Sequence, residues 1–205
     1  MSCSTPLRQA APLALTLVLF LLLAAAVELR LFVAVDASIG EALRLAQGSP
    51  LSRATMTFSL LGQGWALAVT AAVAVLIALG ARRVPAALCI GLSAAGAGLA
   101  NTGLKLLLSR PRPELGLTVA SGYSFPSGHA MGAAAVYLAI GLALARQWPA
   151  KRRVWLSGAV ALILAMGLSR LGLGVHFASD VLAGWLLGAG WAVWLDQRCS
   201  PRPST

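Results

Sequence analysis

His176 and Asp180 are two ionisable residues whose spacing suits catalysis. Four positions apart, they lie on one face of a helix, so the carboxylate can accept the proton of one imidazole nitrogen. That contact fixes the tautomer and leaves the other ring nitrogen as an oriented, electron-rich nucleophile. A His–Asp pair within an apolar chain can also be a proton relay or a structural contact. The pair therefore gains its meaning from the polar residues that accompany it.

Three cationic residues, Lys105, Arg112 and Arg170, favour phosphate chemistry. A phosphoryl group in transfer spreads its negative charge over three equatorial oxygens, and cations aimed at these oxygens are the main way in which a protein stabilises it. Arginine contributes a planar fork and lysine a point charge. The alternative is that such residues are interfacial anchors whose charged ends extend outward to water. We adopt that interpretation for Arg110, and a phosphate site for the other three.

The segment Pro126-Ser127-Gly128-His129 supplies groups of a second kind. A proline followed by Ser-Gly predicts a turn that leads into a helix N-terminus, where backbone N–H groups and the Ser127 hydroxyl can hold phosphate oxygens. Gly128 lets the backbone come close to such a ligand. His129 is a second imidazole, suited to protonate a leaving alkoxide. Taken alone, the segment would be a capped helix with a chance histidine.

The composition of the chain indicates which elements must position these residues. Of its 205 residues 59% are hydrophobic and 11% are charged, far from the average of soluble domains. A bilayer-spanning helix needs about 20 mostly apolar residues and satisfies its own backbone hydrogen bonds in lipid. Six stretches qualify, at about 11–34, 56–80, 84–108, 128–146, 153–172 and 176–195. We therefore predict an all-α polytopic membrane protein of six transmembrane helices, in a single domain (1–196) followed by a disordered cytoplasmic tail (197–205).

A short helix is predicted between the first two spans, within residues 36–53. Ser38 and Glu41 have the S-x-x-E spacing of a capping box. Ile39 and Leu43 then fall on one face of the helix, opposite charged residues. This pattern predicts a helix that lies in the membrane interface, and an ordinary solvated connector is the alternative.

The distribution of arginine and lysine predicts the orientation, because cytoplasmic loops carry an excess of both. The side with the two termini carries nine of them: Arg8, Arg82, Arg83, Arg146, Lys151, Arg152, Arg153, Arg198 and Arg202. The other side carries seven, and three of these (Lys105, Arg112 and Arg170) are assigned above to the site. Nine against four remain. We therefore expect both termini in the cytoplasm and the site on the opposite face of the membrane.

Other classes of partner find little support in the sequence. The net charge is +10, yet the basic residues occur in short bursts between apolar runs, so we expect no nucleic-acid partner and favour anionic lipid and phosphate groups. Cys3, Cys89 and Cys199 lack the spacing of a disulfide framework or a metal site. Gly184 and Gly188 have the spacing that lets helix backbones approach closely. The sequence does not reveal an oligomeric state.

Taken together, the three polar segments resemble the three-part signature of the type 2 phosphatidic acid phosphatase superfamily. This is a family of membrane lipid phosphatases related to acid phosphatases and vanadium haloperoxidases. The resemblance is complete in order and spacing, and the six-span layout extends it to nearly the whole chain. The matching segments read Lys105-x6-Arg112-Pro113, Pro126-Ser127-Gly128-His129 and Ser169-Arg170-x5-His176-x3-Asp180.

The resemblance implies a role for each matching residue. His176 would attack phosphorus and form a phosphohistidine, Asp180 would orient it, and His129 would act as general acid and then as base for the incoming water. The residues implied to bind the phosphoryl oxygens are Lys105, Arg112, Ser127, Gly128 and Arg170. No cofactor and no metal are expected, because besides Asp180 only Glu114 is a carboxylate near the segments, too few for a two-metal site.

The resemblance implies a lipid phosphate or diphosphate as substrate and the lipid bilayer as surroundings. Candidate substrates are undecaprenyl diphosphate, phosphatidylglycerol phosphate, phosphatidic acid and lipid A phosphates, and the compact build resembles bacterial members that handle the first two. The expected location is the bacterial inner membrane, with the active site on the periplasmic or outer face. Two alternatives stay open: a phosphotransferase on the same scaffold, and a non-catalytic lipid-phosphate binder or transporter.

Overall fold

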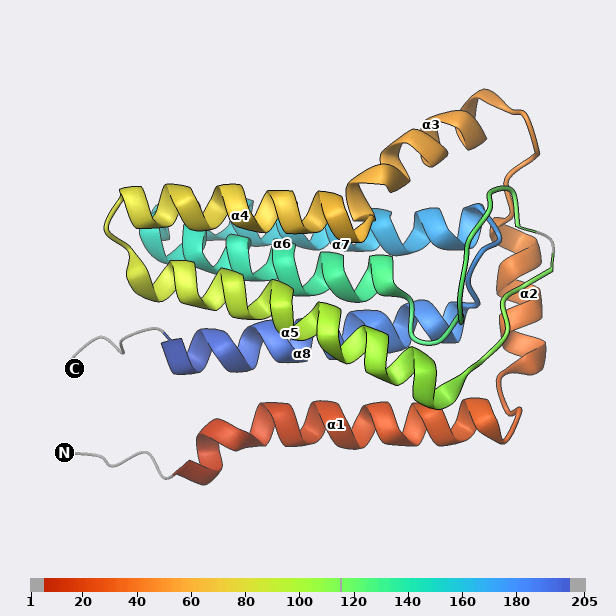
Figure 1. Ribbon diagram of the computed structural model, residues 1–205, viewed down its shortest axis with the longest axis horizontal. Coiled ribbons are helices and arrows are strands. Elements are labelled where there is room, and N and C mark those ends of the chain that lie inside the picture. Colours follow the sequence, from red (N-terminus) through yellow and green to blue (C-terminus); the bar gives the residue numbers. More distant parts are fainter. Residues whose placement is uncertain (1–5, 115, 200–205) are drawn as a thin grey trace.

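The computed structural model describes residues 6–114 and 116–199, and their side chains from Pro12 onward. In this part of the chain every regular element is a helix (Figure 1). In chain order the elements are α1 (Pro6–Glu28), α2 (Val33–Leu43), α3 (Pro50–Ser59), the 3-10 turn η1 (Leu60–Gly62), α4 (Gly64–Gly80), α5 (Val84–Leu108), α6 (Gly128–Gln147), the 3-10 turn η2 (Pro149–Lys151), α7 (Arg152–Gly172) and α8 (Ala178–Cys199). The predicted all-α class is confirmed.

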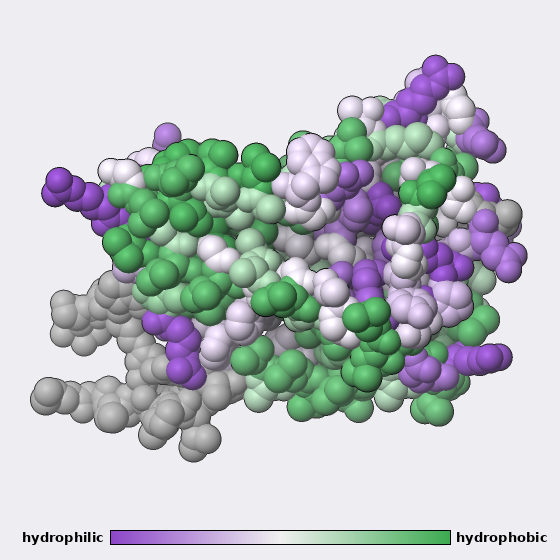
Figure 2. All heavy atoms as spheres, in the orientation of Figure 1, coloured by the Kyte–Doolittle hydropathy of each residue, from purple (hydrophilic) through white to green (hydrophobic). Residues whose placement is uncertain are grey.

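Four helices are long and apolar enough to cross a bilayer, namely α5, α6, α7 together with η2, and α8. Two further pairs of helices are long and apolar enough when each pair is taken together, although both are bent: Pro12–Glu28 meets α2 at 93°, and Pro50–Gly62 meets α4 at 54°. The number of spans is six if each bent pair counts as one. Hydrophobic side chains cover α1, α4 and α5 along the bundle, whereas hydrophilic ones gather at the end where α2 lies (Figure 2).

The short helix between the first two spans begins earlier than the sequence pattern indicates. α2 starts at Val33 after Phe32, and the hydroxyl of Ser38 donates to the Val35 carbonyl in its middle. The predicted capping box is therefore wrong, because Ser38 lies one turn inside the helix. α2 does run across the end of the bundle (Figure 1), as a helix in the membrane interface would. A separate helix, α3, follows and is capped by the Ser49 side chain.

α6 and α8 pack closely because glycine faces the partner backbone. A Cβ atom on Gly184 would lie 2.7 Å from the Ser127 carbonyl oxygen, and one on Gly188 would collide with the Met131 carbonyl oxygen. Both contacts are with backbone, which cannot rotate away. The prediction that this glycine pair serves close helix packing is confirmed, and the pair brings the start of α6 against the start of α8.

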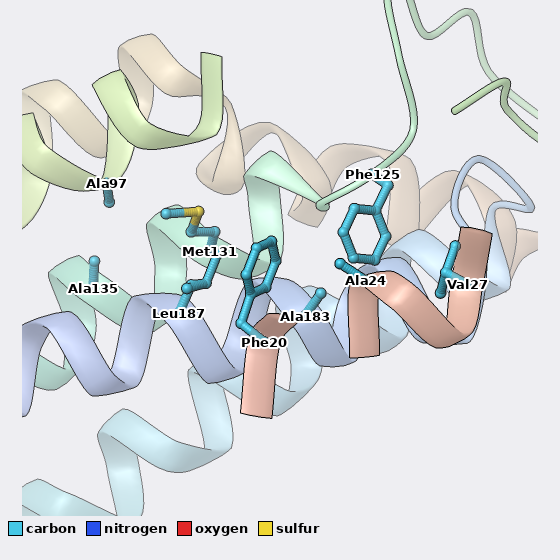
Figure 3. Packing of buried hydrophobic residues seen from close by; sticks show 9 residues of the cluster. All are labelled: Phe20, Ala24, Val27, Ala97, Phe125, Met131, Ala135, Ala183 and Leu187. Carbon is cyan, nitrogen blue, oxygen red and sulfur yellow. The ribbon is translucent and has the colours of Figure 1, made fainter. Parts of the chain in front are cut away.

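The loop before α6 is fixed on α1 by an aromatic contact (Figure 3). Phe125 is fully buried, and its ring centroid lies 5.8 Å from that of Phe20 on α1. Such a pair is worth about 0.5–1.5 kcal/mol beyond the area that it buries. Met131, Ala183 and Leu187 continue the same cluster between α6 and α8. The segment that leads into Pro126 and Ser127 is thereby anchored to the first span.

The elements place the polar segments at one end of the bundle. α1 begins and α8 ends at the opposite end, beside the turn between α4 and α5 (Figure 1). The end of α5, residues 109–114 and 116–127, the start of α6 and the α7–α8 junction meet at the end of the bundle across which α2 runs (Figure 1). α8 continues through Cys199, so residues 197–199 of the predicted tail are helical, and residues 200–205 lie outside the described part.

Candidate active site

His176 and Asp180 meet at the junction of α7 and α8. His176 Nδ1 lies 3.3 Å from Asp180 Oδ2, and both side chains are buried. The same oxygen accepts the backbone N–H of Phe177 at 2.9 Å and the hydroxyl of Ser124. Asp180 thus closes the first turn of α8 while it holds the imidazole, because one carboxylate oxygen serves both.

The second ring nitrogen of His176 faces a cation. Arg112 Nη1 lies 3.1 Å from His176 Nε2, and a guanidinium nitrogen can only donate. Nε2 is therefore the acceptor, and the ring proton is on Nδ1, toward Asp180. Burial, helped by Arg112 and Lys105 and opposed by Asp180, lowers the pKa of His176 to about 4. The imidazole is neutral at pH 7, with a lone pair on Nε2.

Lys105 and Arg112 are held by the 109–127 loop that folds around them. Lys105, in the last turn of α5, donates to the Tyr123 carbonyl and, at 3.3 Å, to that of Ser124. Arg112 donates to three backbone carbonyls at 2.9–3.0 Å, those of Ser121, Gly122 and Val175. Burial lowers the pKa of Arg112, and the guanidinium remains charged because its ordinary pKa lies far above neutral pH. The two cations are fixed in position by the backbone.

Two buried donors near these cations have no partner. Within the described ranges four buried side-chain nitrogen or oxygen atoms lack a hydrogen bond, and Ser127 Oγ and Arg170 Nε are two of them. Arg170 is otherwise held by the hydroxyl of Ser59 at the end of α3. An unpaired buried polar group costs about 1–3 kcal/mol, more if charged. A ligand with several acceptor oxygens would remove that cost.

The predicted residues surround one cavity of about 530 Å³. Six of the eight line it: Lys105, Arg112, Gly128, His129, Arg170 and His176. Asp180 lies behind His176, and the buried Ser127 precedes Gly128 at the start of α6. The structure therefore brings together residues that are up to 75 positions apart in the sequence. The hydrophilic surface over this end of the bundle marks the region (Figure 2).

The interpretation of Arg110 as an outward anchor is wrong. Its side chain is 15% exposed and bridges two carboxylates: Nη1 lies 2.6 Å from Asp180 Oδ1, and Nη2 lies 2.8 Å from Asp36 Oδ2. Sequence reasoning also missed Asp36, Ser124 and Ser59 as partners of the site residues. A signal existed for Asp36, because an acidic residue at the end of an apolar run needs a cation when it is buried.

The donor set of the cavity suits an anion. Cations, hydroxyls and the N-terminus of α6 line or adjoin it, and helix N-termini attract phosphate. Across residues 6–114 and 116–199, His, Cys, Asp and Glu side chains form no group of three or more that could hold a metal ion. The arrangement of a neutral, oriented imidazole among fixed cations can support nucleophilic attack on a phosphoryl group.

Fold and site together define a class, a helical membrane protein with a cationic cavity at one end of its bundle. Comparison with known families gives a corresponding result. The sequence model of the family described as the PAP2 superfamily matches residues 86–198, more than half of the chain. The chain therefore belongs to the PAP2 superfamily.

Individual relatives carry phosphatase names. The chain is 43% identical over 95 residues to phosphatidylglycerophosphatase B of Bacillus subtilis, across 44% of this chain and 46% of that protein. It is 41% identical over 69 residues to undecaprenyl-diphosphatase of Sulfolobus acidocaldarius, across 33% and 29%. The aligned parts thus span less than half the length of these relatives.

A solved structure resembles almost the whole chain. It is the crystal structure described as the first transmembrane PAP2 type phosphatidylglycerolphosphate phosphatase from Bacillus subtilis. The TM-score is 0.82 at 29% sequence identity, and the likeness covers 91% of this chain and 94% of that one. The prediction of a multi-pass membrane protein is confirmed by this likeness together with the apolar helices.

Proposed function

We propose that this protein is an integral membrane phosphatase that hydrolyses a lipid phosphate or diphosphate through a phosphohistidine intermediate and without a metal ion. The observation that carries the proposal is the 3.1 Å contact between Arg112 Nη1 and His176 Nε2. It presents a neutral nitrogen, oriented from behind by Asp180, at the wall of a cationic cavity. Attack on an anionic phosphoryl group requires both a nucleophile and neutralising charge at that point.

The proposed reaction has two steps. Nε2 of His176 bonds to phosphorus while the bond from phosphorus to the lipid oxygen breaks, and His129 gives its proton to the leaving oxygen. His129, now neutral, takes a proton from water as the water oxygen attacks phosphorus and the bond to His176 breaks. The sum is lipid phosphate plus water giving lipid alcohol plus inorganic phosphate. With a diphosphate, the first leaving group is the lipid monophosphate.

The positive charge for both transition states is assigned to Lys105, Arg112 and Arg170. The unpartnered Arg170 Nε and Ser127 Oγ support this assignment, because phosphate oxygens would satisfy them. Gly128 lines the cavity at the N-terminus of α6, where backbone N–H groups favour a bound phosphate. Fixed cations stabilise transferring phosphoryl groups as metal ions do, which is the basis for proposing a metal-independent reaction.

An apolar cavity supports a lipid as the substrate. It has a volume of about 840 Å³, lies between α4, α5 and α6, and shares Gly64, Gly128 and His129 with the polar cavity. Its walls are mainly small and aliphatic, including Leu67 and Ala71 on α4. A hydrocarbon chain would lie there while its phosphate occupies the polar cavity. The likeness to a phosphatidylglycerolphosphate phosphatase makes phosphatidylglycerol phosphate the first substrate to test, and undecaprenyl diphosphate the second.

The distribution of arginine and lysine supports an orientation with both termini in the cytoplasm, in what we propose to be a bacterial inner membrane. The Arg110 side chain pairs with two carboxylates at the site, so it joins Lys105, Arg112 and Arg170 among the basic residues with a role there. Nine basic residues on the side of the termini then contrast with three on the other side. We accordingly propose that one domain, residues 1–196, presents its active site at the outer face.

The test is phosphate release by detergent-purified protein in the presence of a chelator. Phosphatidylglycerol phosphate, undecaprenyl diphosphate and phosphatidic acid are offered separately, with His176→Ala as the inactive control. Release from one lipid that is lost in the variant supports the proposal. Phosphate transfer to an added alcohol without release to water would indicate a phosphotransferase. Tight lipid binding without either reaction would indicate a binder or transporter and refute the proposal.

A further inference from the structure

Arg110 links two carboxylates that come from distant parts of the chain. One nitrogen of its guanidinium binds Asp180 Oδ1 at 2.6 Å and the other binds Asp36 Oδ2 at 2.8 Å. The plane of the guanidinium also lies over the Phe177 ring, 4.1 Å from its centroid. With contacts at both nitrogens and on one face, Arg110 has little freedom to turn. Its position is therefore set jointly by α2, α8 and the α7–α8 junction.

Asp36 reaches the start of α8 from α2. Its Oδ1 accepts the backbone N–H of Ser179 at 2.9 Å, and its Oδ2 accepts the Ser179 hydroxyl at 2.7 Å. The Ser179 hydroxyl in turn lies 2.8 Å from Arg110 Nη1. Asp36 is 2% exposed, and a carboxylate buried to this extent needs partners for its charge. Ser179 and Arg110 supply partners for both of its oxygens. α2 thus closes the first turn of the helix that carries Asp180.

The two oxygens of Asp180 have separate partners. Oδ1 binds Arg110, and Oδ2 accepts from His176, from Ser124 and from the Phe177 N–H. Because the carboxylate is planar, a grip on Oδ1 sets the direction in which Oδ2 faces the imidazole. A turn of this plane would weaken the bond to Nδ1 and release the tautomer that keeps the Nε2 lone pair in the cavity.

We propose that Asp36 and Arg110 are positioning residues that act through Asp180 to hold His176 in its nucleophilic tautomer and orientation. The interfacial helix α2 is thereby part of the catalytic apparatus, although none of its residues lines the polar cavity. The expected effect on turnover rests on the proposed phosphatase function. Its physical content, the state of the His176 ring, can be measured without any substrate.

The charges around His176 predict the direction in which each variant should shift its titration. The charged and titratable groups that face it are Lys105 from α5, Arg110 and Arg112 from the 109–127 loop, His129 from α6, Arg170 from α7, Asp180 from α8 and, one contact further, Asp36 from α2. Asp36→Asn removes a negative charge and makes His176 harder to protonate. Arg110→Gln removes a positive charge and makes it easier to protonate. The two variants should move the titration of His176 in opposite directions, which a general loss of structure would not do.

The chain has two histidines, so the measurement is simple. Full-length protein carrying ¹⁵N-histidine gives two sets of ring nitrogen signals in detergent, and His129→Gln assigns them. Wild type should show His176 with its proton on Nδ1. Asp36→Asn and Arg110→Gln should show mixed tautomers and titration shifts of opposite sign. Asp196→Asn, which removes the carboxylate of the separate Arg146–Asp196 pair at the other end of the bundle, is the matched control and should change neither signal.

Kinetics complete the test on the lipid that wild type hydrolyses. A misplacement of about 1 Å at a reacting group can cost about 100-fold, so Asp36→Asn should lower kcat about tenfold or more and leave KM within about twofold. Arg110→Lys should lose less of kcat than Arg110→Gln, because lysine keeps the positive charge although it lacks the second nitrogen. Ser179→Ala, a milder change, should show the same tautomer mixing if Asp36→Asn does not fold.

Each outcome separates the two proposals. Altered His176 signals in the network variants, with an unchanged Asp196→Asn, support the inference even if wild type releases no phosphate. That last result would refute the proposed function alone. A single unmixed Nδ1-H tautomer and an unmoved titration in folded Asp36→Asn, Arg110→Gln and Ser179→Ala would overturn the inference, whatever the activity of wild type.

Discussion

Gly184 packs directly against the backbone at the start of α6, so its replacement tests the packing of α6 against α8. Replacing it with alanine would place a Cβ atom 2.7 Å from the Ser127 carbonyl oxygen and 3.0 Å from the Met131 backbone nitrogen. An ordinary contact needs about 3.4 Å, so α6 and α8 must separate by roughly 0.7 Å. Overpacking of this kind costs about 1–3 kcal/mol, and alanine returns up to about 1 kcal/mol as the better helix former.

At the middle of the overpacking range, about 2 kcal/mol, the net cost for Gly184→Ala is about 1–2 kcal/mol of folding free energy. For a chain of this length each kcal/mol corresponds to roughly 2–4 °C, so Tm in detergent should fall by roughly 2–8 °C. Activity should fall as well, because the Ser127 N–H donates to the Asp180 carbonyl at 3.0 Å across the same contact. Displacements of about 1 Å at a catalytic site can cost about 100-fold, and we expect a loss of about tenfold in kcat.

The assay is thermal unfolding followed by tryptophan fluorescence, together with phosphate release. Gly158→Ala is the matched control, because it is the same substitution within α7 and its Cβ would meet nothing within 4 Å. The control should keep the activity of wild type and melt at the same temperature or slightly higher. A Gly184→Ala protein that melts at or above the wild-type temperature with full kcat would refute the described α6–α8 contact.

Three further predictions test the site. Arg112→Lys keeps the charge but loses the fork that binds three carbonyls and faces His176 Nε2. A charged hydrogen bond is worth about 1.5–3 kcal/mol, so kcat/KM should fall roughly 10- to 100-fold. The control Arg146→Lys, at the far end of the bundle, should leave kcat/KM unchanged. Because burial lowers the pKa of His176 to about 4, its ¹⁵N signals in the substrate-free protein should keep the neutral pattern as the pH falls through 6.5, and a midpoint near 6.5 would contradict the burial described. Gly98→Leu would fill the apolar cavity, where a Cβ meets nothing within 4 Å; KM should rise for a long-chain lipid phosphate and stay constant for a short-chain one, and an equal rise for both would contradict the assignment of this cavity to the lipid chain.

The sequence predicts the parts of this molecule that local pattern determines. The apolar runs define the helices, because length and hydropathy act on each segment separately. The Gly184–Gly188 pair predicts close helix contact for the same reason. The eight residues of the polar segments meet at one end of the bundle, where six of them line one cavity, since each lies at or near a helix end on that side.

The remaining features depend on partners far away in the chain. Arg110 has the local appearance of an interfacial anchor, and its two carboxylate partners are 70 and 74 positions distant. Ser38 and Glu41 match a capping box, yet the chain turns into α2 five residues before Ser38. Tertiary pairing decided each of these cases.

The central claim is that the Nε2 atom of His176 carries the phosphoryl group between two steps. The most direct measurement is a rapid quench with ³²P-labelled phosphatidylglycerol phosphate, or with whichever lipid wild type hydrolyses, followed by analysis of the protein. We expect protein-bound label that survives alkali, is lost in mild acid, maps to the peptide containing His176 and is absent from His176→Ala. Phosphate release by folded His176→Ala at the wild-type rate would contradict it.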